Sequence, residues 1–259
     1  MNRLLLFLII IILVYIYYYH MPELFDDGKV YFMNKDEVIN FFKNDPDDYT
    51  KNLSNLDIIA LKSSSKDDYK NKSISDVMDF TFRDKKILKD ACRDADNFLS
   101  TFDGKGIPNI NFKKIAQMKW KLAKTNGKWY EAGYPHTRQD IIFITPDVIN
   151  HKEVVRIMIH EKIHVFERLF PNEILGWMKS EGYTPYKQFK EYPMGRSNPD
   201  LNGIVYKDKY GNETIALFKN NNPKGIDDSY YPGGKDWKFE HPYETLAYKV
   251  DYAYAGEEF

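Results

Sequence analysis

The segment IMIHEKIHVFERLF, residues 157–170, constrains the fold of this chain more than any other. In a helix, at about 100° per residue, its apolar side chains form a wide arc, whereas His160 and His164 share the opposite, narrow face. A helix that is apolar over so much of its surface packs at the centre of a domain. Asn150 and Glu153 precede it in a capping-box pattern, which predicts where the helix begins.

The narrow face of this helix carries the residue types of a zinc site. Two imidazoles one turn apart can bind the same tetrahedral Zn²⁺, and Glu161, about 100° away around the helix, can reach a water molecule on that ion without being a ligand. Two surface histidines on an amphipathic helix would explain the same five residues. The wide apolar arc favours the zinc site, because it indicates a central helix. We therefore predict Zn²⁺ as the cofactor, bound by His160 and His164.

A third protein ligand is required, since a catalytic zinc ion has three and keeps one position for water. The metzincin pattern needs glycine at 167 and histidine at 170, where this chain has Glu167 and Phe170. A second predicted helix, within residues 239–255, places Glu244 in its first turn, and we favour Glu244 as the ligand. His241 is the chief alternative, and a first-turn acid can also act only as a cap of its own helix.

The rest of the pattern predicts a domain of the α+β class. Apolar residues recur at intervals of three and four over 82–102, which is typical of a backing helix. Alternation over 118–122, followed by Asn126-Gly127 and residues 128–130, predicts a β-hairpin, and DIIFIT at 140–145 predicts a further strand. The expected order is a backing helix, a small mixed sheet, the HExxH helix and a second ligand helix.

Hydropathy and composition divide the chain into three parts. Residues 1–20 are expected to form a transmembrane anchor, residues 21–80 an N-terminal extension or tether, and residues 81–259 the α+β domain. The polar stretch at 62–76 is expected to be loop or tether. Residues 172–240, rich in Tyr, Asn, Pro and Gly, are expected to form an insertion that builds the lower lobe of a cleft.

The anchor prediction rests on the unbroken apolar run Leu4–Tyr19, near the short limit of the roughly 17–25 residues that span a bilayer. A buried soluble helix is disfavoured because the run leaves no polar face, and a cleaved signal peptide because its last residues are bulky where cleavage needs small ones. Arg3 before the run and acidic residues after it favour a single-pass protein with a cytosolic N-terminus and a lumenal or extracytosolic domain. On that topology the sequons at Asn52, Asn71 and Asn212 would be open to glycosylation.

Charge and cysteine content exclude two further classes. The formal net charge is −1, with 37 Lys+Arg against 38 Asp+Glu and no basic stripe, so nucleic acid is not an expected partner. Cys92 is the single cysteine of the chain, which excludes an intramolecular disulfide framework.

Further polar residues are candidates for contacts with a substrate or its oxyanion. His136 and Arg138 follow Gly133 and Pro135 in a short strand that we expect at the edge of the sheet, where zinc peptidases align a substrate backbone. The other candidates lie in or next to the insertion: Tyr192, Arg196, Asn198, Asp200, Tyr206, Tyr230, Tyr231 and His241. Ordinary packing is the competing role for each of them.

HEKIH followed much later by HPYETLAY resembles the gluzincins, the thermolysin-like zinc peptidases whose third ligand is a glutamate on a second helix. The anchor, PHTRQDIIFIT, HEKIHVFERLFP, RSNPDLNGIVY and EHPYETLAY together resemble uncharacterised membrane-anchored metallopeptidases of large DNA viruses, over most of the chain. The resemblance implies a zincin-like fold and a host or virion membrane. It also implies zinc ligation by His160, His164 and Glu244, with Glu161 as the general base.

The sequence departs from the gluzincin pattern at one position. In many gluzincins an aspartate four residues after the ligand glutamate orients a zinc histidine, and here that position is Tyr248. We expect Asp251 or Glu167 to take its place.

These expectations together predict a membrane-anchored zinc metallopeptidase that hydrolyses protein or peptide substrates. The zinc ion would lower the pKa of bound water to about 7, and Glu161 would take the proton of that water and return it to the leaving amine. One alternative is a non-catalytic membrane or virion protein that retains a zincin fold, although a scaffold has no use for Glu161. A zinc amidase that acts on something other than protein is a second alternative.

Overall fold

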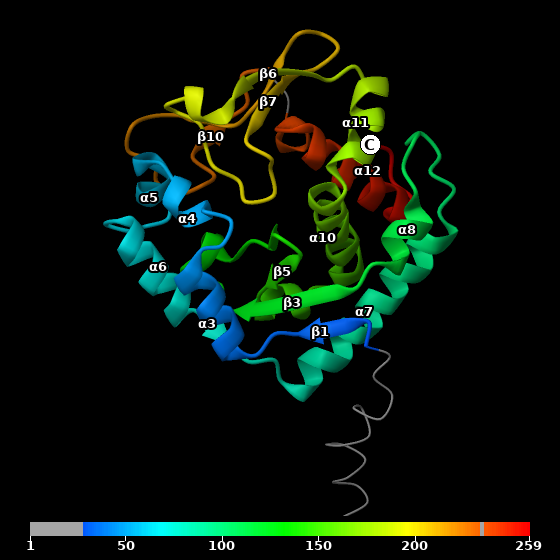
Figure 1. The fold of residues 1–259 in the computed structure, drawn as a ribbon, viewed down its shortest axis with the longest axis horizontal. Helices are drawn as coiled ribbons and strands as arrows, with labels where there is room; N and C mark the ends of the chain where they lie inside the picture. The colour runs from blue at the N-terminus through cyan, green and yellow to red at the C-terminus, as the bar shows by residue number, and fades with distance from the viewer. Residues whose placement is uncertain (1–27, 234–235) are drawn as a thin grey trace, which may run out of the picture.

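The computed structural model describes residues 28–233 and 236–259, which form an α+β fold with a small mixed sheet (Figure 1). The expected anchor, residues 1–20, lies outside the described residues. Within 28–233 and 236–259, none of the helices combines the length and the apolar character needed to cross a membrane.

The main sheet has five strands. Neighbouring strands follow the order β1-β3-β5-β4 across the sheet, and β2 also pairs with β3. Parallel pairing joins β1 to β3 and β3 to β5, whereas β2 and β4 run antiparallel to their neighbours. The edge position expected for the strand that holds His136 and Arg138 is therefore confirmed. The strands are β1 (Val30–Phe32), β2 (Val77–Met78), β3 (Trp120–Thr125), β4 (His136–Arg138) and β5 (Ile141–Ile144).

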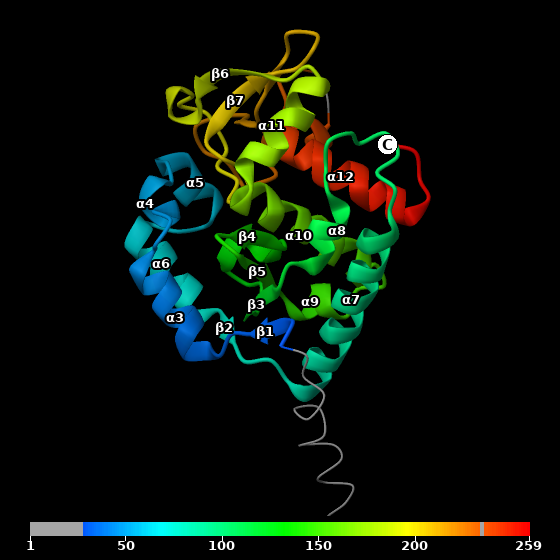
Figure 2. The same ribbon diagram turned by 45° about the vertical axis from the view of Figure 1, so that its right-hand side comes forward.

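The two faces of the sheet are covered by different helices, because side chains alternate along each strand. On one face Leu122, Ile142 and Ile144 join a core with the long helices, and on the other Ala123 and Phe143 join a second core with the N-terminal helices. Figure 2 shows these layers, with the N-terminal helices on one side of the sheet and α7 to α12 on the other. The first group is α3 (Lys35–Asn44), α4 (Tyr49–Asn52), α5 (Asn55–Ala60) and α6 (Lys66–Ser75); the second is α7 (Phe82–Thr101), α8 (Phe112–Gln117), α9 (Pro146–Ile149), α10 (Val154–Leu169) and α12 (Pro242–Ala255).

Residues 28–80 are part of the fold, so the expected tether is wrong for this range. Strands β1 and β2 both pair with β3, and most of the polar stretch 62–76 forms α6. Ser65 caps this helix by accepting a hydrogen bond from the backbone of Asp68, and Tyr69 is buried against the ring of Tyr130. A single large aromatic side chain thus anchors a helix whose composition is otherwise that of a loop.

The predicted hairpin after β3 is also wrong. Residues 130–133 form the short 3-10 helix η1 (Tyr130–Gly133), and the next partner of β3 is the parallel strand β5. The backbone N–H groups of Trp129 and Tyr130 donate to the carboxylate of Asp76, at 2.9 and 3.0 Å. This long-range partner, which the local sequence does not reveal, turns the chain away from β3.

The HExxH helix α10 is present, but its start differs from the predicted capping box. Asn150 ends the short helix α9, and Glu153 is the N-cap residue of α10 without a side-chain hydrogen bond to the helix. Helix α10 ends at Leu169, and Pro171 begins the next helix, α11 (Pro171–Ser180). The helix therefore starts a few residues later than the sequence pattern indicates, because α9 uses Asn150 first.

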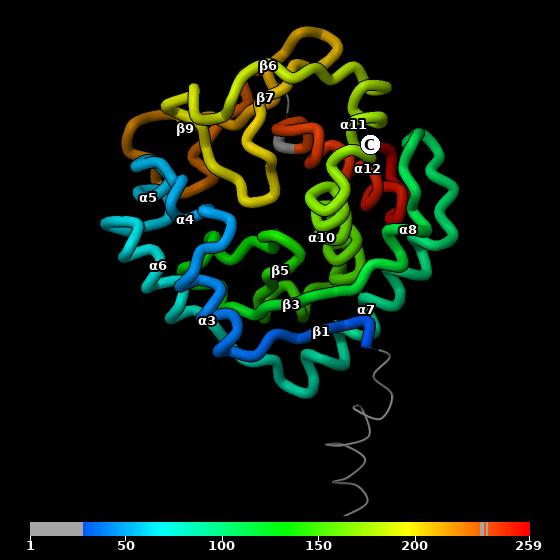
Figure 3. The backbone as a smooth tube through the Cα atoms, in the orientation of Figure 1, coloured from blue at the N-terminus to red at the C-terminus, as the bar shows by residue number. Residues whose placement is uncertain are grey.

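The segment expected as an insertion forms a separate layer opposite the main sheet. Figure 3 shows its backbone at the top of the molecule, and near residue 200 it descends between the N-terminal helices and α10. It contains a three-stranded sheet, order β6-β7-β8, and a two-stranded one formed by β9 and β10. Its elements are β6 (Thr184–Gln188), η2 (Phe189–Glu191), β7 (Ile204–Lys207), β8 (Glu213–Thr214), β9 (Leu217–Phe218), β10 (Ser229–Tyr230) and η3 (Trp237–Phe239).

Candidate metal centre

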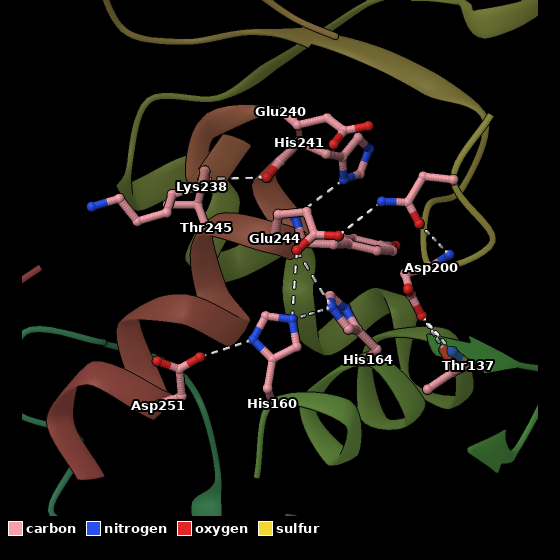
Figure 4. Close-up of polar contacts among 12 residues, drawn as sticks. Thr137, His160, His164, Asp200, Lys238, Glu240, His241, Glu244, Thr245 and Asp251 are labelled. Carbon is pink, nitrogen blue, oxygen red and sulfur yellow. Dashed lines mark hydrogen bonds and ion pairs between the residues drawn. The ribbon is translucent and has the colours of Figure 1, made fainter. Parts of the chain in front are cut away.

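Helices α10 and α12 bring three potential metal ligands together. The Nε2 atoms of His160 and His164 are 3.0 Å apart, and Oε2 of Glu244 lies 3.5 and 3.7 Å from them. All three side chains are buried, and their ligand atoms lie within 4.8 Å of one another. Figure 4 shows the carboxylate of Glu244 above the two imidazoles. This cluster can hold a metal ion.

The hydrogen bonds of the two imidazoles define which ring nitrogens face the cluster. Nδ1 of His160 lies 3.0 Å from Oδ2 of Asp251, and Nδ1 of His164 lies 2.8 Å from Oε2 of Glu167. A carboxylate accepts hydrogen bonds, so each Nδ1 carries the hydrogen and each Nε2 of a neutral ring presents a lone pair. Two lone pairs at 3.0 Å repel each other unless a cation lies between them.

The distances in the cluster fit a small tetrahedral ion. Ligand atoms about 2.0–2.1 Å from a tetrahedral zinc ion lie about 3.3 Å from one another. The three separations between His160, His164 and Glu244 run from 3.0 to 3.7 Å and bracket this value. Two imidazoles and one carboxylate are also a ligand set that zinc accepts in catalytic sites.

Both residues expected as substitutes for the missing aspartate orient a histidine. Asp251 holds His160 and is itself held by Arg156, whose Nε lies 3.0 Å from Oδ1. Glu167 is completely buried behind His164. Tyr248, at the position of the gluzincin aspartate, packs its ring on His160 with centroids 4.3 Å apart. The carboxylates that orient the two imidazoles therefore come one from α10 and one from α12.

His241, the alternative third ligand, is not part of this cluster. It is the N-cap residue of α12, where Nδ1 accepts a hydrogen bond from the backbone of Tyr243 at 3.1 Å. Its Nε2 lies near the carbonyl of Ile204, at 3.2 Å, and the side-chain oxygen of Asn202. Burial lowers the pKa of His241 to about 3, so the ring serves as a neutral cap. The cap role that the sequence left open for Glu244 thus belongs to His241.

The electrostatics of the cluster favour positive charge at its centre. Burial alone would lower the pKa of His160, but its hydrogen bonds to Asp251 and Glu244 raise it to about 9. The pKa of His164 is also raised well above its ordinary value, since the negative charges of Asp200 and Glu244 outweigh burial. Burial opposes ionisation of Glu244 as well, yet the two histidines hold its pKa well below the usual range. The surrounding carboxylates therefore stabilise a cation at this point.

Glu161 lies beside the cluster without belonging to it. Its side chain is buried, and its Oε2 has no hydrogen-bond partner among the described residues. Burial, with the charge of Asp200, raises the pKa of Glu161 to about 8. A carboxylate with a pKa near neutrality and an unused oxygen can exchange protons with a molecule bound next to the cluster.

A cavity of about 820 Å³ opens onto this site. His160, Glu161, Glu244 and Tyr248 are among its lining residues, and other parts of its wall come from β4, from the segment near residue 200 and from the start of α10. Its volume lies within the roughly 300–1,000 Å³ of small-molecule and cofactor pockets. The cavity can therefore admit a substrate group to the cluster.

Some of the expected substrate-contact residues do line this cavity. His136 and Arg196 are among its walls, and so are Asn198, Asp200 and Tyr231. Most of them already have protein partners: Nδ1 of His136 bonds the carbonyl of Tyr134, and Arg196 is paired with Glu240.

The other candidates lie outside the cavity lining, and all of them except the exposed Tyr230 are packed elsewhere. Arg138 is buried and pairs with Asp45, at 2.6 Å, and with Asp47, which joins β4 to the N-terminal helices. The hydroxyl of Tyr192 donates to Glu213 at 2.7 Å. Tyr206 accepts a hydrogen bond from Asn202, and Tyr230 and His241 also lie outside the cavity lining. For these residues the competing interpretation, ordinary packing, describes the observed contacts.

The edge strand β4 is engaged on its outer side. The backbone N–H of Thr137 donates to Oδ1 of Asp200 at 2.7 Å. The guanidinium of Arg168 lies 3.4 Å from the backbone carbonyl oxygen of Thr137. The outward groups of Thr137 are thus occupied by protein side chains.

The sequence interpretation missed that both Asp251 and Glu167 are used, and it missed Arg156. Spacing was a usable signal, since Glu167 lies three residues after His164 and Asp251 lies seven after Glu244, which places each pair on one helix face. Arg156, one turn before His160, had no such signal.

Comparisons with protein families, with curated proteins and with solved structures found no match for this chain.

Proposed function

We propose that this protein is a zinc-dependent metallopeptidase of the HExxH type. The observation that carries the proposal is the convergence of Nε2 of His160, Nε2 of His164 and Oε2 of Glu244, with the free carboxylate oxygen of Glu161 beside them on a cavity. Three ligands, an acid outside the ligand set and an accessible space are the parts that metal-assisted hydrolysis requires.

Each part of the site has a distinct duty in this proposal. His160, His164 and Glu244 hold the ion, and a bound zinc ion supplies a Lewis acid that polarises a carbonyl and makes water acidic enough to react at neutral pH. Glu161 takes the proton of the attacking water and returns it to the leaving amine. Asp251 and Glu167 keep Nε2 of each imidazole turned towards the ion.

The arrangement of the elements supports a zincin-like fold. Helix α7 backs α10, the mixed sheet ends in the antiparallel edge strand β4, and α12 supplies the third ligand next to α10. This order is the one that the gluzincin resemblance implies for the chain.

The proposed substrate is a protein or peptide, and the proposed location is a membrane reached through the N-terminal apolar run. A formal net charge of −1 gives no general attraction for nucleic acid. The resemblance to membrane-anchored metallopeptidases of large DNA viruses makes a host or virion membrane the proposed site of action.

Glu161→Gln tests the proposal, because the amide keeps the shape of the side chain and removes the base. Zinc content and melting temperature should stay near those of the wild type, while cleavage of a peptide library falls by several orders of magnitude. Zinc is measured by elemental analysis of the purified protein, and cleavage by mass spectrometry.

Two results would contradict the proposed peptidase activity or the role of Glu161 in it. Wild-type protein loaded with one zinc ion that cleaves no member of a broad library favours the non-catalytic scaffold. Equal cleavage by wild type and Glu161→Gln would show that Glu161 is not the general base.

A further inference from the structure

The segment that descends beside α10 touches the metal cluster through one side chain. Nδ2 of Asn198 donates to Oε1 of Glu244 at 2.9 Å. The other carboxylate oxygen of Glu244, Oε2, is the one that faces Nε2 of both histidines. One oxygen of Glu244 is therefore occupied by the protein and the other faces the cluster.

The orientation of the Asn198 amide is fixed by a second hydrogen bond. The backbone N–H of Asp200 donates to Oδ1 of Asn198 at 2.9 Å. A backbone N–H can only donate, so Oδ1 must face Asp200 and the NH₂ group must face Glu244. The donor towards Glu244 is thus assigned by its neighbours.

Asp200 in turn anchors this segment to the edge of the sheet. Its Oδ1 accepts hydrogen bonds from the backbone N–H and from Oγ1 of Thr137, both at 2.7 Å, as Figure 4 shows. Arg168 of α10 donates to the carbonyl of Pro199 at 2.7 Å and fixes the segment from the other side. Asp200 is itself buried, so these contacts form inside the protein.

We infer that Asn198 is a positioning residue for the metal ligand Glu244. By holding Oε1, it leaves Oε2 as the single oxygen for the ion and makes Glu244 a monodentate ligand. The anchor of Asp200 on β4 keeps Asn198 in place, so the edge strand and the third ligand are joined by one short segment. The inference rests on the metal site of the proposed function.

The experiment compares Asn198→Ala with the wild type and with Asn202→Ala. Asn202 lies in the same segment but donates to the hydroxyls of Tyr206 and Tyr243. Loss of a group that orients a ligand typically weakens metal binding by about 10–100-fold. We expect a loss of that size for Asn198→Ala and affinity near the wild type for Asn202→Ala, both measured by competition with a chromophoric zinc chelator.

A spectroscopic measurement separates positioning from a general loss of stability. Cobalt(II) in place of zinc should give a visible spectrum that differs between wild type and Asn198→Ala, because the freed carboxylate can turn and offer both oxygens. Asp200→Asn provides a second variant if Asn198→Ala does not fold. This change also removes a negative charge near the cluster, so its readout is the cobalt spectrum, which the weaker anchor of Asn198 should alter.

The failures of the two proposals are distinguishable. A wild type that binds no zinc overturns the proposed function. The role of Asn198 alone is overturned if the wild type binds zinc and the folded Asn198 variant has an equal affinity and an equal cobalt spectrum. An equal cobalt spectrum in the Asp200 variant overturns it as well.

Discussion

The two sides of helix α10 both carry buried polar groups, but they are completed in different ways. On the side towards α12, Nε2 of His160 and Nε2 of His164 face each other across 3.0 Å. On the side towards α7 and β3, Lys162, the central residue of the same HExxH motif, is also buried. Burial of a polar side chain therefore does not by itself distinguish a ligand from a structural residue.

The Lys162 side is filled by protein partners. Its ammonium is paired with Asp96 and donates to the carbonyl of Met118 at 2.9 Å. Asp96 is also held by Lys29 at 2.7 Å and by the indole N–H of Trp120 at 3.1 Å. Every polar group in this cluster has a protein partner of the opposite kind.

This difference indicates that a metal site is recognised by several ligand atoms that converge on one point, and not by burial alone. The Lys162 cluster balances donors and acceptors, and it needs nothing from outside the chain. When both imidazoles are neutral, Nε2 of His160, Nε2 of His164 and Oε2 of Glu244 are three acceptors around one point, and a cation completes them. Variants on the two sides of α10 should therefore differ in zinc binding.

The largest effect is expected from His160→Ala and His164→Ala. Either change removes one of the three proposed ligands, so the zinc expected in the wild type should be lost. Elemental analysis after dialysis measures it. Stoichiometric zinc in both variants would end the interpretation of this side of α10 as a metal site.

A smaller loss is expected from Glu244→Gln, because an amide oxygen is a poorer zinc ligand than a carboxylate. Zinc affinity should fall while some binding remains, and any peptidase activity should fall with the occupancy. His241→Ala is the control, since His241 caps α12 and lies outside the cluster. Normal zinc binding by Glu244→Gln together with loss in His241→Ala would show that the third ligand is misassigned.

Much of the ligand side could be predicted from the sequence because its geometry is local. Two histidines four residues apart on a strongly apolar helix face the same way whatever the rest of the fold is. The position of Glu244 in the first turn of a second helix was also readable. What the sequence could not decide was which groups of that second helix turn inwards, since this depends on the packing of α12 against α10.

The fold was predictable where periodicity is strong and failed where a distant partner decides the conformation. The backing helix α7 and the strand β5 follow from their apolar patterns. The hairpin after β3 failed because Asp76, about 50 residues earlier, binds the backbone at Trp129 and Tyr130. Helix α6 was hidden because its composition is polar and its burial rests on few residues, chiefly Tyr69. These errors share a cause, which is that a long-range contact outweighs the local pattern.

The smallest effect is expected from Lys162→Met, although Lys162 lies inside the motif. Methionine fills a similar volume, and Asp96 keeps Lys29 and Trp120 as partners, so zinc content should not change. The melting temperature at pH 7 should change by about 2–4 °C or less, which corresponds to about 1 kcal/mol for a protein of this size. Zinc loss comparable to that of His164→Ala would contradict the separation of the two sides.

The pH dependence of the same variant tests the buried charge itself. Burial lowers the pKa of Lys162 to about 8, below the roughly 10.4 of an exposed lysine, so between these values the unfolded chain binds a proton that the folded chain does not. The free energy of unfolding therefore rises with pH over that window as the folded chain loses the proton. Below about pH 8 the buried ammonium is charged and destabilises the folded state by its full amount. The melting temperature of the wild type should rise relative to Lys162→Met from pH 8 to pH 10. Lys179→Met, at an exposed position of α11, should lack this relative change. If the melting temperatures of wild type and Lys162→Met change in parallel with pH, the pKa of Lys162 is not lowered in the folded protein. The ammonium would then need a further acceptor beside Asp96 and the carbonyl of Met118.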